Sequence, residues 1–158
     1  MTALRFLALP TDRVRDLQNG GLDANGRAPE RQVSVGRGNL CRHCLSDVAE
    51  GDELLVLAYR PFPAPQPYAE VGPLFLHAGP CARHEASAQL PAVFGSRDRL
   101  LLRAYGPDDR ILYGSGRLVT PEDVPDAAGA LLAWPAAAYL HLRSATNGCY
   151  QCRIERGI

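Results

Sequence analysis

Short apolar runs, separated by turns rich in glycine and proline, dominate the hydrophobic pattern of the chain. The runs that suit β-strands cover residues 4–9, 53–60, 73–81, 99–105, 110–119, 136–144 and 148–156, and residues 31–35 are a further candidate. Runs of this length, bounded by turn residues, are typical of antiparallel sheets. We therefore expect five to seven strands, most of them paired in an antiparallel way.

Helices are expected to be few and short. Residues 12–19 form an amphipathic stretch that ends at a glycine pair, which is a common helix stop. Thr120 resembles an N-cap before Pro121, and the helix that follows is expected to break at Pro125 and then resume. Strands with two or three short helices indicate an α+β fold, mainly an antiparallel β-sheet, in one globular domain over residues 1–158.

Composition narrows the classes of function. Acidic and basic residues balance at 17 each, so nothing indicates a nucleic-acid partner. Every basic residue is arginine, which excludes lysine chemistry. No apolar run reaches the roughly 20 residues of a membrane helix, and the start of the chain lacks the features of a signal peptide. We expect a cytoplasmic protein without a membrane partner, whose five cysteines stay reduced.

Cysteine and histidine residues fall into three clusters that could bind a metal. The clusters are Cys41, His43 and Cys44, then His77, Cys81 and His84, and finally Cys149 and Cys152. Structural zinc takes four thiolate or imidazole ligands in a tetrahedron, and a Cys-x-x-Cys turn supplies two of them. The most economical set is Cys41, Cys44, His77 and Cys81. The Gly-Pro break at residues 79–80 could fold Cys81 back toward His77.

The remaining candidates serve as reserve ligands or as core residues. His84 has suitable spacing from Cys81 and is the first reserve. Cys149 and Cys152 form a second Cys-x-x-Cys pair, but in a regular strand they point to opposite faces, so Cys152 is expected in the core first and as a ligand second. A site of four cysteines from both Cys-x-x-Cys pairs stays open as an alternative. His43, between two cysteines, is expected to point to solvent. His141, in an apolar strand, is expected to be half-buried.

Two alternatives to a zinc-stabilised binding or regulatory domain stay open. The Cys41-x-x-Cys44 pair could serve thiol-dependent redox chemistry, since such motifs lower a thiol pKa. A metal-free module could instead bind a small anionic ligand through Arg103, Arg110, Arg117 and Arg143, if they share one face of a sheet; these are the arginines on predicted neighbouring strands. No catalytic motif accompanies either possibility, so we expect no enzyme.

Four segments carry a family resemblance. They are "GNLCRHCL", "PLFLHAGPC", "LLLRAYGPDDRILYGSGRLV" and "AYLHLRSATNGCYQCRIER", in that order along the chain. The chain resembles the bacterial domain of unknown function family 1203 from about residue 30 to the end, with the "GCYQCRIER" stretch as the most distinctive part. The resemblance implies a small single-domain bacterial protein without an established activity.

Overall fold

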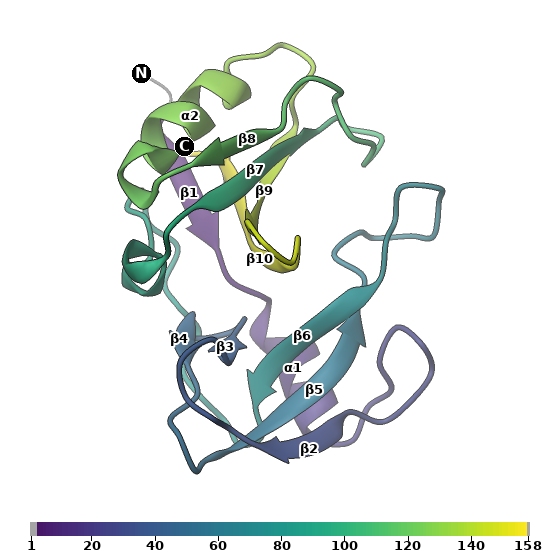
Figure 1. The fold of residues 1–158 in the computed structure, drawn as a ribbon. Helices are drawn as coiled ribbons and strands as arrows, with labels where there is room; N and C mark the ends of the chain where they lie inside the picture. The colour runs from purple at the N-terminus through teal and green to yellow at the C-terminus, as the bar shows by residue number, and fades with distance from the viewer. Residues whose placement is uncertain (1–2, 158) are drawn as a thin grey trace. The chain divides into compact units, whose positions relative to one another are not determined.

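The computed structural model describes residues 3–157, which form two compact units (Figure 1). The larger unit contains the residues up to Leu7, Ala64–Ala69, and the chain from Glu85 onward. The smaller unit contains Ala8–Pro63 and Glu70–His84. Within residues 3–157, no helix has both the length and the apolar character needed to cross a bilayer. The single domain expected from chain length stays a prediction.

The larger unit is built on a five-stranded antiparallel sheet. Its strand order is β1 (Leu4–Leu7), β10 (Tyr150–Arg156), β9 (Tyr139–Ser144), β7 (Leu100–Tyr105) and β8 (Arg117–Val119). Helix α2 (Val124–Leu132) packs on this sheet and buries Leu131 and Leu132. Alternation along β7 buries Leu100 and Leu102 completely, as expected for one face of a strand against a core. Two short 3₁₀ helices, Ala92–Ser96 and Pro121–Asp123, complete the unit.

The smaller unit holds a second five-stranded sheet. Its strand order is β2 (Glu30–Val33), β5 (Glu53–Tyr59), β6 (Gly72–His77), β3 (Leu40–Cys41) and β4 (Ser46–Asp47). All its strand pairs are antiparallel except β3 with β6, which run parallel. This exception places the residues that follow β3 beside the end of β6.

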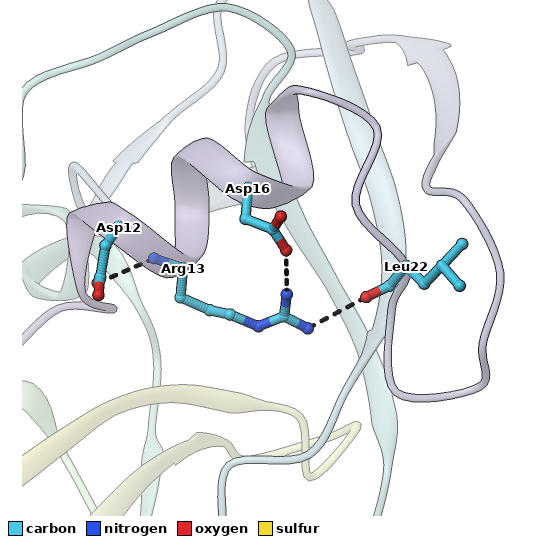
Figure 2. A network of polar contacts seen from close by, with 4 residues as sticks. All are labelled: Asp12, Arg13, Asp16 and Leu22. Atoms are coloured by element: carbon cyan, nitrogen blue, oxygen red, sulfur yellow. Dashed lines mark hydrogen bonds and ion pairs between the residues drawn. The ribbon is translucent and has the colours of Figure 1, made fainter.

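Helix α1 (Thr11–Gln18) belongs to the smaller unit and buries Val14 and Leu17. On its surface, the Arg13 guanidinium donates to Asp16 at 2.7 Å and to the Leu22 carbonyl at 3.2 Å (Figure 2). Exposed ion pairs of this kind contribute little free energy. The Arg13 contacts therefore connect the helix to the segment that follows it and add little stability, while the burial of Val14 and Leu17 holds the helix in place.

The α+β class is confirmed, but several details of the prediction are wrong. The described residues form ten strands in two sheets, more than the five to seven expected, with two α-helices. Pro125 does not interrupt a helix, because α2 begins at Val124 and a proline in the first turn lacks only an unneeded donor. The expected strand over 110–119 is reduced to β8, since Asp109 adopts a left-handed conformation (φ 62°) and the chain then loops.

His141, in β9 of the larger unit's sheet, is almost completely buried, with 1% of its surface exposed, whereas the sequence predicted a half-buried residue. Arg103 on β7 and Arg153 on β10 lie directly opposite it in the strand register. A third arginine, Arg143, places Nη2 3.1 Å from His141 Nδ1. Burial, then the charges of Arg143, Arg153 and Arg103, hold the pKa of His141 well below its usual range.

We expect a His141→Gln variant to lose part of the pH dependence of stability. In the unfolded chain His141 takes up a proton below about pH 6.5, whereas the folded chain keeps it neutral. The free energy of unfolding should therefore fall as pH drops below about 6.5, by at most about 1.4 kcal/mol per pH unit for this group. Urea unfolding of both proteins between pH 7.5 and 5 measures the difference. Identical pH profiles would contradict the assignment.

Candidate metal centre

A tight turn between two short strands forms the first half of the centre. β3 and β4 pair Cys41 with Ser46, and the Leu45 amide donates to the Cys41 carbonyl at 2.9 Å. Leu45 adopts a left-handed backbone conformation, with φ of 52°, although its side chain is 97% buried. Such a conformation is uncommon for leucine, and it reverses the chain directly after Cys44. This strained residue belongs to a turn that places Cys41 and Cys44 on the same side.

The second half of the centre follows β6. The parallel pairing of β3 with β6 places Cys41 beside Phe75, so His77 comes two residues later on the neighbouring strand. The His77 amide donates to Cys41 Sγ at 3.3 Å. The chain then passes through the Gly-Pro break at 79–80 and reaches Cys81. Two segments far apart in the sequence thus meet at one point of the smaller unit.

The four residues Cys41, Cys44, His77 and Cys81, called the Cys/His group below, converge closely. Their sulfur and nitrogen atoms all lie within 4.8 Å of one another. Cys41 Sγ and Cys81 Sγ are 3.9 Å apart, and Cys44 Sγ and His77 Nδ1 are 3.5 Å apart. In a zinc tetrahedron the corresponding distances are about 3.8 Å between two sulfurs and about 3.6 Å between sulfur and nitrogen. The group could therefore hold a metal ion, and it is the set that the sequence predicted as ligands; their role as ligands stays a prediction.

The three thiols of the group differ in how readily they ionise. The pKa of Cys41 is lowered to about 4, mainly by a hydrogen bond with the Cys44 side chain and also by the amides of Cys44, His77 and His43, although burial opposes these effects. The same hydrogen bond, followed by burial, raises the pKa of Cys44. Burial and then the charge of Cys41 raise the pKa of Cys81 to about 11. One thiolate is thus favoured at neutral pH, and a cation at the centre would be needed to keep all three thiols ionised.

The polar face of α1 supports the segment that carries His77 and Cys81. Arg15 donates to the Cys81 carbonyl at 2.7 Å and to the Gln18 side chain at 2.9 Å. Gln18 in turn donates to the carbonyls of His77, at 2.9 Å, and Gly79, at 2.8 Å. The positive charge of Arg15 also favours the thiolate of Cys81. These contacts fix the chain where it leaves the end of β6 and continues toward Cys81.

The expectation that His43 points to solvent is wrong. Its side chain is fully buried, with Nδ1 3.1 Å from Cys81 Sγ and Nε2 2.9 Å from Thr11 Oγ1. The sequence gives no signal for this placement, because Thr11 is 32 residues away along the chain. His43 is thus a neighbour of the Cys/His group that reasoning from the sequence missed.

The reserve candidates do not join the group. The His84 amide donates to the His43 carbonyl at 2.8 Å, and its ring Nε2 is buried without a hydrogen-bond partner among residues 3–157. Cys149 and Cys152 belong to the larger unit. Cys152 is fully buried in its core beside a register shift in β10, and Cys149 lies in the turn before that strand. All five cysteines fall within residues 3–157, and none of them forms a disulfide bond there.

The four arginines considered for an anionic ligand are divided by the structure. Arg103 and Arg143 both donate to the Tyr105 hydroxyl at 3.3 Å, on the face of the sheet that carries His141. Arg110 instead lies over a tyrosine ring, and Arg117 donates to carbonyls of its own loop. The predicted group of four is therefore not formed. An anionic ligand for the remaining pair stays a prediction.

Comparison with known proteins gives a family and no nearer relative. Neither the curated proteins nor the solved structures contain a match to this chain. A family model with the description "Protein of unknown function (DUF1203)" matches residues 38–156, a stretch that contains the whole Cys/His group and excludes α1. The match covers most of the chain and confirms the resemblance seen in its sequence. The chain therefore belongs to the DUF1203 family.

Proposed function

We propose that Cys41, Cys44, His77 and Cys81 bind one structural zinc ion, and that the protein is a zinc-stabilised binding or regulatory domain rather than an enzyme. The observation that carries this proposal is the agreement of two separations with a zinc tetrahedron: 3.9 Å between two sulfurs and 3.5 Å between sulfur and nitrogen. Both pairs join one half of the centre to the other. A single ion would therefore connect them.

The chemistry of the donors supports zinc among the common metals. Three thiolates and an imidazole are soft or borderline ligands, which suit zinc and do not suit magnesium or calcium. With a divalent ion, three thiolates leave a net charge of −1, and the Arg15 guanidinium close to Cys81 compensates part of it. A reducing compartment such as the cytoplasm would keep the thiols available to the ion.

A structural role follows from the number of ligands. Four protein ligands fill a tetrahedral site, whereas catalytic zinc keeps one position for water or substrate. The polar residues next to the group, Arg15 and Gln18, donate to backbone carbonyls and hold the chain in place. The ion would then tie the 41–44 turn to the 77–84 segment in a unit whose sheet contains two strands of only two residues.

A thiol-dependent redox function is the second candidate, and one observation favours it. The pKa of Cys41 is lowered to about 4, so this thiol would be ionised and nucleophilic at neutral pH. Its expected partner is Cys44, with which it shares a hydrogen bond. This function needs the thiols to be accessible, whereas a bound ion would occupy them.

Metal content separates the two candidates. Elemental mass spectrometry of the untagged protein is expected to find about one zinc ion per chain, as for a structural site with four ligands. The thiols of Cys41, Cys44 and Cys81 should resist alkylation until a chelator is added. Protein without metal, in which Cys41 and Cys44 react at once and form a reversible disulfide, would contradict the zinc proposal and favour the redox function.

A further inference from the structure

The last member of the Cys/His group lies where the fold gives it little support. Cys41 belongs to β3, Cys44 to the tight turn, and His77 ends β6, but Cys81 follows the Gly-Pro break outside any strand. Its backbone is held by Arg15, which donates to the carbonyl at 2.7 Å. That contact fixes the main chain and leaves the direction of the sulfur undetermined. A second contact is needed to aim Cys81 Sγ at the centre.

His43 supplies that second contact. We propose that His43 is the positioning residue for Cys81: its Nδ1–H donates to Cys81 Sγ, 3.1 Å away, while Thr11 fixes the ring through Nε2, 2.9 Å from the hydroxyl. This role rests on the proposed function, because it describes how the zinc-bound thiolate is held. The ring itself is fully buried, so water does not compete for either nitrogen.

The direction of both hydrogen bonds follows from the chemistry of the partners. A metal-bound thiolate carries no hydrogen and can only accept, so Nδ1 of His43 must be the protonated nitrogen. In the neutral ring Nε2 then accepts, and the Thr11 hydroxyl donates to it. One tautomer satisfies both contacts. The alternative tautomer would turn a lone pair toward the sulfur and repel it.

The chain of contacts begins in helix α1. Thr11 is its first residue, and the buried side chains of Val14 and Leu17 anchor the helix in the smaller unit. Just before the helix, the Leu9 amide donates to the Arg42 carbonyl at 3.1 Å, which holds this segment beside the turn of the metal centre. The fold therefore fixes the position of the Thr11 hydroxyl, and the hydroxyl in turn fixes the orientation of the His43 imidazole.

Such a contact affects the ligand in two ways. It orients the sulfur, and it withdraws electron density, which makes the thiolate less nucleophilic. Outer-shell partners of metal ligands typically contribute 10–100-fold to metal affinity. The selective effect on nucleophilicity at Cys81, compared with Cys41 and Cys44, distinguishes a positioning role from a general effect on folding.

Three variants of the full chain test the role. His43→Leu removes both contacts, His43→Asn keeps an amide N–H near the position of Nδ1, and Thr11→Val removes only the hydroxyl. Zinc affinity is measured by competition with a chromophoric chelator, and Cys81 reactivity by alkylation of the zinc-loaded protein with mass mapping of each cysteine. Cobalt(II) substitution reports the thiolate-to-metal charge-transfer bands.

We expect His43→Leu to bind zinc about 10–100-fold more weakly, with faster alkylation of Cys81 than of Cys41 or Cys44 and altered cobalt bands. His43→Asn should recover most of the affinity and the protection of Cys81, and Thr11→Val should fall between them. Wild-type affinity, alkylation and cobalt spectra in all three variants would overturn the positioning role alone.

Measurements on the wild-type chain and on the variants test the zinc site and the positioning role of His43 separately. A wild-type chain that binds neither zinc nor cobalt overturns the proposed function, and the positioning role with it, before any variant is made. If His43→Leu does not fold, the Thr11→Val variant tests the positioning role instead. Faster alkylation of its Cys81, with metal still bound, supports the role, and an unchanged rate overturns it.

Discussion

A Cys81→Ser variant is expected to be purified with almost no zinc. Serine keeps the size of the side chain but replaces a thiolate by a hydroxyl, which stays protonated at neutral pH and is a poor zinc ligand. Only three ligands then remain, and the 77–84 segment loses its connection to the turn of the metal centre. Elemental analysis of the two proteins as purified, without a chelator, should show about one zinc ion per chain in the wild type and near zero in the variant.

Two matched controls come from the other cysteines. Cys149→Ser should keep its zinc and its stability, because this residue lies in a turn of the larger unit. Cys152→Ser should also keep its zinc but lose about 1–3 kcal/mol of stability, because a hydroxyl replaces a fully buried thiol. If Cys81→Ser retained a full complement of zinc, or if either control lost it, the proposed set of ligands would be wrong.

Removal of zinc from the wild-type protein should loosen one unit and leave the other intact. The Cys/His group lies wholly in the smaller unit, so chelation should increase hydrogen exchange of amides in residues 40–48 and 75–84. Amides of β7, β9 and β10 in the larger unit should keep their protection. A ligand present at a thousand times its Kd stabilises by about 4 kcal/mol, and this sets the scale of the expected loss.

Hydrogen exchange followed by mass spectrometry, with and without chelator, makes this comparison peptide by peptide. Restored zinc should return the protection, and magnesium should not, since thiolates do not suit it. Equal loosening of both units, or no change near Cys41 and His77, would contradict a structural ion at this centre.

The four candidate ligands could be predicted from the sequence because each pair of them lies close together along the chain. Cys41 and Cys44 share one turn, and the Gly-Pro break between His77 and Cys81 is visible in the residues themselves. Short apolar runs bounded by turn residues likewise predicted β5, β6, β7 and the hairpin of β9 and β10 to within a few residues. Both kinds of signal depend on neighbours along the chain. The strands were confirmed, and the role of the four donors as metal ligands stays a prediction.

Pairing between segments that lie far apart in the sequence could not be predicted from such local signals. The parallel contact of β3 with β6 joins Cys41 to the neighbourhood of Phe75, and strands of two residues leave no periodic pattern to detect. The burial of His43 and His141 depends on partners contributed by other elements, namely Thr11 for the first and two flanking arginines for the second. Histidine can serve either in the core or at the surface, so its residue type decides nothing by itself.

The register of β5 with β6 also bears on the order in which the centre is assembled. Cys44 and His77 are 33 residues apart, and closing so long a loop costs conformational entropy. Once the hairpin forms, Leu54 lies opposite His77, so only the short stretch after β4 separates the two halves. If the group binds zinc as proposed, a refolding chain could capture the ion on Cys41 and Cys44 early, because these residues are local, but we expect coordination to be completed only after the hairpin has paired. We therefore expect the stability that the proposed zinc ion contributes to appear late in the refolding of this unit.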